Sequence, residues 1–177
     1  NEAGPVELIE RESADALRYW ATSVKTGSDT PFQAETVAIG RRLVTKLWNA
    51  ARFVERNLEG IDREFLDATE VSALLLPTDR WLLSALSRTI SFATRALQEN
   101  DYASARSEVE RFFWSDLCDN YLELVKARLY GEARPARDAA RWTLYHALLA
   151  VLKLLAPYIP YVTEEIYQSL FRDTERD

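Results

Sequence analysis

The most informative absences in this 177-residue sequence concern cysteine, methionine and long apolar runs. Cys118 is the only cysteine, so no disulfide forms within the chain, and the sequence is typical of a protein of the reducing cytoplasm. No stretch reaches the roughly 18 uninterrupted apolar residues of a membrane span, and no signal peptide is recognisable. Because the sequence contains no methionine and begins at Asn1, we expect it to be a fragment of a longer protein.

The residue types that carry catalysis or bind metals are also scarce. His146 is the only histidine, and neither it nor Cys118 has neighbours at the spacing of a zinc site. The five glycines are isolated, so the glycine-rich loop that binds phosphate groups is absent. Glu164 and Glu165 point in different directions on a helix and suit its N-terminal end. We therefore expect no catalytic residue, no metal and no cofactor in this chain.

Acidic residues exceed basic ones by 28 to 22, which gives a net charge of −6. This balance argues against a general nucleic-acid coat. The charges are unevenly placed, however, and residues 41–63 carry more basic than acidic side chains. They are Arg41, Arg42, Lys46, Arg52, Arg56 and Arg63 against Glu55, Glu59 and Asp62. A local basic surface is therefore compatible with the acidic chain.

Apolar residues make up 47% of the sequence and recur with a helical period in every long segment. Proline, glycine and capping residues divide the chain into expected helices at residues 5–12, 14–24, 32–58, 79–100, 102–130, 135–157 and 162–171. A further short helix is expected at residues 62–70, within a long connection. No segment alternates like a strand, so the sequence predicts an all-α fold, an antiparallel helical bundle.

Several details of these helices follow from single residues. Ser13, Thr78 and Asp101 have the side chains of N-terminal caps. The aromatic run at residues 112–114 is apolar around more than one face, which predicts a bend or interruption near residues 114–116. The second half of the helix at residues 135–157 is almost entirely apolar, so we expect this helix to be the most buried.

The expected helix at residues 32–58 has two contrasting faces. The predicted buried stripe consists of Val37, Gly40, Val44, Leu47, Ala51, Val54 and Leu58. The opposite stripe consists of Arg42, Lys46, Asn49, Phe53 and Arg56, which share an arc of about 80° at roughly 100° per residue. The second stripe is basic and contains one aromatic ring.

Two interpretations of the basic stripe remain open at this point. Cations that track phosphate groups, beside a ring on which an unpaired base can stack, are typical of single-stranded RNA recognition. Alternatively, the cations form an ordinary solvated face and Phe53 packs beneath a neighbouring helix as core.

Four stretches resemble the C-terminal part of class I aminoacyl-tRNA synthetases of the valine, isoleucine and leucine group. They are PVELIERESADALRYWA (5–21), GRRLVTKLWNAARFV (40–54), FFWSDLCDNYLELVKARLY (112–130) and LLAPYIPYVTEEIYQSLF (154–171). The linking stretch LPTDRWLLSAL (76–86) fits as well, so the resemblance covers nearly the whole chain. The run CDNYLELVK at residues 118–126 resembles the valyl-tRNA synthetases most closely.

This resemblance implies a function and a division of the chain. Residues 1–30 belong to a stem-contact region that joins the catalytic domain, residues 31–172 form the anticodon-binding helical bundle, and residues 173–177 are a tail. The parent enzyme joins valine to its tRNA with ATP in domains upstream, so the fragment is expected to be inactive alone. The expected partner is tRNA, with no DNA and no membrane, and the protein is expected to be a cytoplasmic monomer.

The resemblance also assigns residues to the tRNA contact. Family contacts to the anticodon carry over to Lys46 and Phe53, while Arg42, Asn49 and Arg52 are expected helpers because of their positions. Four residues depart from the family pattern: the adjacent pair Glu12 and Ser13, then Asn120, and Glu35, which stands where some valine enzymes place a basic residue.

Two rival functions stay open. The nearest is the anticodon-binding domain of an isoleucyl-tRNA synthetase, which the run at residues 118–126 disfavours. The other is a helical protein-interaction module without an RNA role, in which the basic stripe serves only solubility.

Overall fold

The computed structural model describes residues 4–24, 27, 31–60, 65 and 71–175, and every regular element in these ranges is helical. The elements are α1 (Pro5–Glu12), α2 (Ala14–Ala21), α3 (Ala34–Leu58), α5 (Val71–Leu74), α6 (Pro77–Gln98), α7 (Tyr102–Arg111), η1 (Phe112–Tyr121), α8 (Leu122–Leu129), α9 (Arg134–Leu155) and α10 (Pro160–Leu170). This confirms the all-α class. Within these ranges, no helix has the length and apolar content to cross a membrane. The helix expected at residues 62–70 falls outside the described residues.

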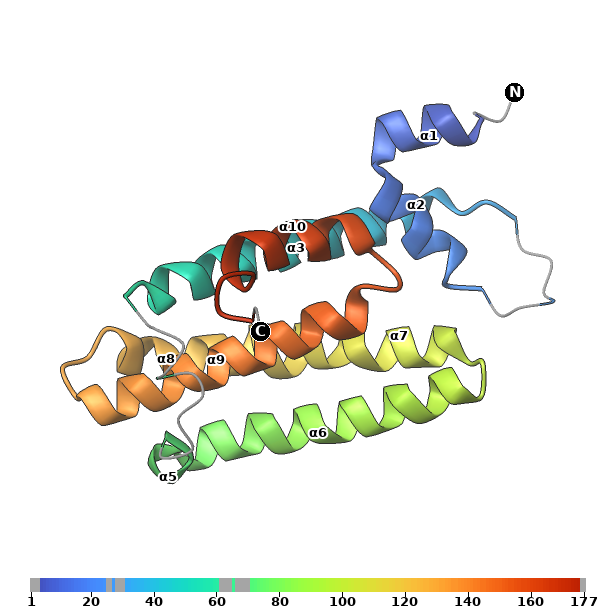
Figure 1. Cartoon of the computed structure of the whole chain (residues 1–177). Helices are drawn as coiled ribbons and strands as arrows, with labels where there is room; N and C mark the ends of the chain where they lie inside the picture. The colour runs from blue at the N-terminus through green and yellow to red at the C-terminus, as the bar shows by residue number, and fades with distance from the viewer. Residues whose placement is uncertain (1–3, 25–26, 28–30, 61–64, 66–70, 176–177) are drawn as a thin grey trace.

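The bundle is built in three layers around α9 (Figure 1). Helices α3 and α10 pack on one side of α9, α6 packs on the other, and α7 and α8 lie beside it in the middle. Eleven residues of α9 are buried, which confirms the expectation that it is the most buried helix. Because α9 separates them, α3 and α6 form opposite outer layers of the molecule.

Helix α2 begins as the sequence predicts and ends earlier. The Ser13 hydroxyl accepts a hydrogen bond of 3.3 Å from the N–H of Ala16, which confirms Ser13 as the cap. The sequence predicts an end at residue 24, whereas the helix ends at Ala21. The hydroxyls of Thr22 and Ser23 donate hydrogen bonds to carbonyls of the last turn, where they compete with continuation of the helix.

Close packing joins α2 to α3 and to α7. A Cβ atom placed on Gly40 would lie 2.7 Å from the Cβ of Tyr19, so the two helices approach each other where α3 has no side chain. The Tyr19 hydroxyl donates a hydrogen bond of 2.8 Å to Glu110, and the Arg106 guanidinium lies 4.0 Å from the centre of the tyrosine ring. Tyr19 thus fixes α2 to the bundle.

The start of α6 differs from the prediction. Thr78 is expected as its cap, but the helix begins at Pro77 with Leu76 in the capping position. The Asp79 carboxylate in the first turn accepts a hydrogen bond of 2.8 Å from the N–H of Leu76. Proline at the first position needs no backbone donor, so the helix starts one residue before Thr78.

The helical period of residues 79–100 predicts an apolar stripe that consists of Trp81, Leu82, Leu86, Ile90, Ala93 and Leu97. Half of this stripe lies at the surface. Leu82, Leu86 and Ala93 are buried as the pattern predicts. Trp81, Ile90 and Leu97 are exposed instead, by 40%, 38% and 40%. The remaining buried positions of α6 hold mostly small side chains, which permit a close approach to α7 and α9. They are Asp79, Ala85, Thr89 and Ala96.

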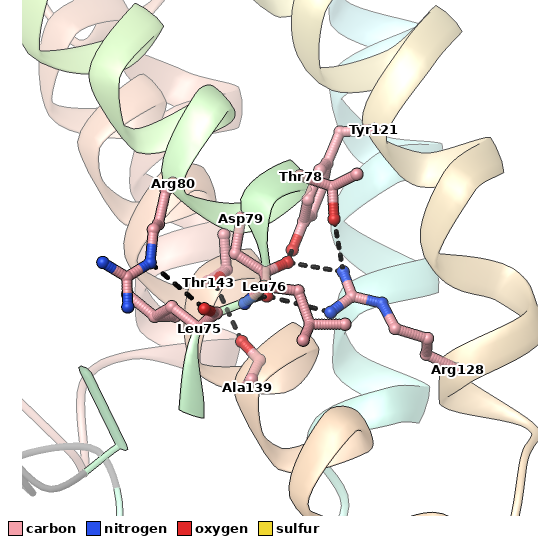
Figure 2. Close-up of polar contacts among 9 residues, drawn as sticks. All are labelled: Leu75, Leu76, Thr78, Asp79, Arg80, Tyr121, Arg128, Ala139 and Thr143. Atoms are coloured by element: carbon pink, nitrogen blue, oxygen red, sulfur yellow. Dashed lines mark hydrogen bonds and ion pairs between the residues drawn. The ribbon is translucent and has the colours of Figure 1, made fainter. Parts of the chain in front are cut away.

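A buried ion pair connects the first turn of α6 with α8 (Figure 2). Asp79 is fully buried, and its carboxylate accepts hydrogen bonds from both terminal nitrogens of Arg128. The Tyr121 hydroxyl donates a further hydrogen bond of 2.6 Å to the same carboxylate, and Thr78 accepts one of 3.4 Å from Arg128. Three helical segments therefore meet at one charged group, which has the partners that a buried carboxylate requires.

The interruption expected near residues 114–116 occurs, in the form of a π-helical segment. Residues of η1 that are five positions apart, Phe112 with Leu117 and Phe113 with Cys118, are all buried. In an α-helix, such pairs would differ by about 140° around the axis and could not all face the core. The wider π-helical turn accommodates the aromatic run without exposing it.

Candidate nucleic-acid interface

The two faces of α3 are arranged as the sequence predicts, with small differences. The residues that pack inward are Val37, Gly40, Leu43, Leu47, Ala50, Ala51, Val54 and Asn57. Val44 and Leu58, predicted as buried, are half-buried, and Leu43 takes a core position that the prediction omits. Arg42, Asn49, Arg52 and Arg56 are exposed. The basic residues thus lie on the outer surface of the bundle along α3, which also carries the exposed side chains of Ile39 and Trp48.

Lys46 lies at the edge of this outer surface and reaches towards η1. Its side chain is 37% exposed, its Nζ lies 5.2 Å from the centre of the Trp114 ring, and it lies 3.9 Å from Oδ1 of Asp119. The Asp119 side chain is 64% exposed, so the pair is weak, with a typical contribution of about 0 to 1 kcal/mol. Lys46 can therefore exchange Asp119 for a phosphate group at little cost in stability.

Phe53 lies on the same edge of α3 as Lys46, two turns further along. Seven residues separate them, which places them about 20° apart around the axis and about 10 Å apart along it. The Phe53 ring is half-buried and packs against the core, and its carbonyl accepts a hydrogen bond of 2.8 Å from Asn57. Part of the ring is therefore held by the bundle, while part remains open to a base.

Glu35 occupies the first turn of α3 and is exposed. Its position is 11 residues before Lys46, which is about 20° away around the helix and about 16 Å along it. A carboxylate on that line opposes a bound phosphate chain. The basic surface is therefore strongest from Arg42 to Arg56 and weakest at the beginning of the helix.

The structure also shows residues of η1 that the sequence argument did not connect with α3. Trp114 and Asp119 both contact Lys46 and are separated from it by more than 65 positions. The only sequence signal for Trp114 is the aromatic run at residues 112–114, and that run predicts an interruption of the helix without indicating a contact with α3. The edge of α3 that carries Lys46 is thus formed jointly with η1.

The two residues considered for chemistry have packing roles in the structure. Cys118 is buried, and burial raises the pKa of its thiol to about 12, so it is protonated and unreactive at neutral pH. The ring of His146 is half-buried, and its centre lies 4.0 Å from that of Trp142 and 5.2 Å from that of Tyr145. Among the described residues, no three His, Cys, Asp or Glu side chains gather where a metal ion could bind.

Similarity to known proteins extends over nearly the whole chain. It is 41% identical over 173 residues to the valine–tRNA ligase of Orientia tsutsugamushi, 42% identical over 174 residues to that of Ehrlichia ruminantium, and 40% identical over 173 residues to that of Thermococcus kodakarensis. These alignments cover 95%, 96% and 98% of this chain and 20%, 20% and 19% of the relatives. The chain thus spans about a fifth of the length of these curated relatives.

Among solved structures, the free form of the methionyl-tRNA synthetase of Mycobacterium tuberculosis has a similar fold. The TM-score is 0.68 at 18% sequence identity, over 93% of this chain and 34% of that chain. Residues 79–176 match the family model described as the anticodon-binding domain of tRNA ligase. Because this match covers more than half of the sequence, the chain belongs to the family of anticodon-binding domains of tRNA ligases.

Proposed function

We propose that the chain binds the anticodon arm of a valine tRNA through the outer surface of α3. The protein that contains it would join valine to that tRNA with ATP, at a site outside these 177 residues. The observation that carries the proposal is the geometry of α3, where exposed Arg42, Asn49 and Arg52 lie beside a half-buried Phe53. The alignments to valine–tRNA ligases cover 95% and 96% of the chain, so they include most or all of α3.

Each of these side chains suits one part of an RNA loop. The guanidinium groups of Arg42 and Arg52 can pair with phosphate oxygens, which positions the strand and releases counterions. The Asn49 amide has both donors and an acceptor, so it can bond to the edge of an unpaired base. The exposed part of the Phe53 ring offers a face on which a base stacks. Lys46 adds a cation that can leave Asp119 for the RNA.

Binding at this site is remote from the proposed chemistry and acts through positioning. Energy gained at the anticodon loop holds the whole tRNA in place, so that its acceptor end reaches the reactive site in the correct orientation. The contact requires only a local positive surface. The net charge of −6 is therefore compatible with tRNA binding.

Two rival functions are less well supported. An isoleucine enzyme fits the fold equally well, but the run at residues 118–126 and the names of the curated relatives favour valine. A protein-interaction module would need an apolar centre on the exposed surface of α3. That centre is polar instead, because it is formed by Arg42, Asn49 and Arg56. The monomeric state and the cytoplasmic location stay predictions.

The salt dependence of tRNA binding tests the proposal. The double variant Arg42→Gln/Arg52→Gln should weaken binding of valine tRNA and lower the slope of log K against log salt by about 2, since about one counterion contact is lost per residue. The control Arg134→Gln/Arg172→Gln removes the same charge from exposed positions outside α3. Equal weakening by both variants would show that only net charge matters. Equal binding of isoleucine and valine tRNA would refute the valine assignment.

A further inference from the structure

The exposed side of α6 carries a second positive surface, on the opposite outer layer from α3 (Figure 1). Its basic residues Arg80, Arg88 and Arg95 are exposed. Its only acidic residue, Asp79, is fully buried and paired with Arg128. All exposed charges of α6 are therefore positive, although the chain as a whole is acidic.

Aromatic rings and cations alternate along one line of this helix. At about 100° per residue, Trp81, Arg88, Phe92 and Arg95 share an arc of about 60° and extend about 21 Å along the axis. Trp81 is 40% and Phe92 is 38% exposed, and the Arg95 guanidinium lies 6.0 Å from the centre of the Phe92 ring. Two large rings thus remain at the surface on the line that carries the arginines.

A groove lies beside the second half of this line, from Ser87 to Arg95, and Glu108 of α7 forms its other side. Its volume is about 520 Å³, and it is lined by Ser87, Arg88, Ser91, Phe92, Arg95 and Glu108. Pockets of roughly 300 to 1,000 Å³ are the size that holds small ligands, so the groove has room for a nucleotide. Most of its polar lining consists of donors, from the two arginines and the two serine hydroxyls.

Glu108 is the one carboxylate that lines the groove, and its charge is already paired with an arginine. Glu108 accepts hydrogen bonds from Arg111 at 2.8 and 3.0 Å and from the Thr89 hydroxyl at 3.3 Å. These contacts with Arg111 hold the pKa of Glu108 below its usual value, so its charge is balanced at neutral pH. A phosphate group in the groove would therefore meet Arg88 and Arg95 without an unpaired acid beside them.

We propose that the outer surface of α6 binds single-stranded RNA, with phosphates on Arg88 and Arg95 and bases on the rings of Trp81 and Phe92. Alternating cations and exposed rings are what a strand of unpaired nucleotides requires. An acidic polypeptide would pair with the arginines but would gain little from two exposed rings. Since α6 packs on α7, η1 and α9, and α3 on α2, α9 and α10, this contact is separate from the one proposed for α3.

The test uses fluorescence anisotropy with a labelled oligouridylate as the probe, in a chain whose α3 surface has been disabled by Arg42→Gln/Arg52→Gln. This chain should still bind the probe. Adding Arg88→Gln/Arg95→Gln should weaken binding by about tenfold or more and lower the salt slope by about 2. Phe92→Ala should weaken binding by at least about fivefold, as expected from loss of stacking. The control Arg134→Gln/Arg172→Gln should change the affinity less than about twofold.

Several results would overturn the proposal. They are an absence of probe binding at low salt, equal losses in the control and in Arg88→Gln/Arg95→Gln, and competition by oligoglutamate as strong as that by unlabelled oligouridylate. The last result would identify α6 as a surface for acidic polypeptides. All altered residues are at least partly exposed, and circular dichroism would verify that the variants stay folded. The α3 proposal is measured separately with valine tRNA, so either proposal can fail while the other stands.

Discussion

The Asp15 carboxylate of α2 accepts a hydrogen bond of 2.8 Å from the backbone N–H of Val162, in the first turn of α10. The same carboxylate accepts a second bond of 3.1 Å from the N–H of Tyr161. Asp15 is buried, and the cap of α10 thus comes from a helix that lies almost 150 residues earlier. Negative charge at this end of a helix is stabilised by unpaired N–H groups and by the helix dipole.

Replacement of Asp15 tests this cap. Asp15→Ala should lower the free energy of unfolding by about 1 to 2 kcal/mol, because a buried and a partly buried N–H group lose their acceptor. Urea denaturation measures the loss. Glu165→Ala removes an exposed carboxylate from α10 and should cost less than about 0.5 kcal/mol. Equal effects of the two substitutions would exclude a capping role for Asp15.

Replacement of Gly40 by alanine should change stability in the opposite direction from most glycine-to-alanine changes in helices. In most helix interiors this change stabilises by up to about 1 kcal/mol, since glycine is a poor helix former. At Gly40 the new Cβ would lie 2.7 to 2.9 Å from three carbon atoms of Tyr19, so Gly40→Ala should destabilise by about 1 to 3 kcal/mol. Thermal unfolding gives the sign. Combining the change with Tyr19→Ala should reduce the penalty only in part, because alanine keeps the Cβ atom that lies 2.7 Å from the new methyl group. A stabilising Gly40→Ala would contradict the close packing of α2 on α3.

Asp79 predicts a loss of stability in acid. Burial alone raises the pKa of Asp79, but hydrogen bonds from Arg128, Tyr121 and the N–H of Leu76 outweigh it, and the pKa lies below the usual 3.8. A carboxylate whose pKa is lower in the folded state stabilises the protein above the unfolded pKa. Its contribution is therefore lost as the pH falls below about 4.

Urea unfolding at several acidic pH values measures this contribution. The unaltered chain should lose stability from pH 4 downwards, while Asp79→Asn should be less stable at pH 7 and vary less with pH below 4. At neutral pH the variant should lose about 3 to 5 kcal/mol, because Arg128 keeps a partly buried charge without its partner. The same pH dependence in both proteins would assign the acid sensitivity to other carboxylates.

The local elements of the fold could be predicted from the sequence, whereas most contacts between them could not. Periodicity and terminal prolines locate α1, α3 and α9, and even the interruption in the aromatic run shows as crowding of apolar residues. The pairing of Asp15 with α10, of Asp79 with Arg128 and of Lys46 with Trp114 joins residues 49 or more positions apart. No local period encodes such pairs. Trp81 is predicted as buried but is exposed for the same reason. Periodicity identifies the apolar residues of a helix, but it does not show which of them pack against another helix.

Replacement of Asp119 should change the affinity for tRNA. Its carboxylate lies 3.9 Å from Nζ of Lys46 and is exposed on the side that tRNA is proposed to approach. Asp119→Asn should strengthen tRNA binding by a factor of about 2 to 5, because it frees Lys46 and removes a repelling charge. Filter binding at low salt measures the change. Glu123→Gln, which alters an exposed residue paired with Lys126, is the control, and an equal gain there would point to net charge alone.

Leu47 and Phe53 separate the stability of α3 from its binding. Leu47 is fully buried, and Leu47→Ala should lower the free energy of unfolding by about 2 to 5 kcal/mol through the cavity it leaves. The ring of Phe53 is only half-buried, so Phe53→Ala should lower the free energy of unfolding by less than Leu47→Ala does. Urea denaturation of both variants checks this order. A Phe53→Ala variant as unstable as Leu47→Ala would make Phe53 an ordinary core residue.

The affinity of Phe53→Ala for valine tRNA decides whether the outer surface of α3 holds an unpaired base, provided that circular dichroism shows the variant to be folded. If a base stacks on the ring, binding should weaken by about 1 to 3 kcal/mol, while Phe53→Tyr, which keeps an aromatic face, should bind nearly as well as the unaltered chain. An unchanged affinity in Phe53→Ala would refute the proposed anticodon contact at this position, because no base would then stack on the Phe53 ring.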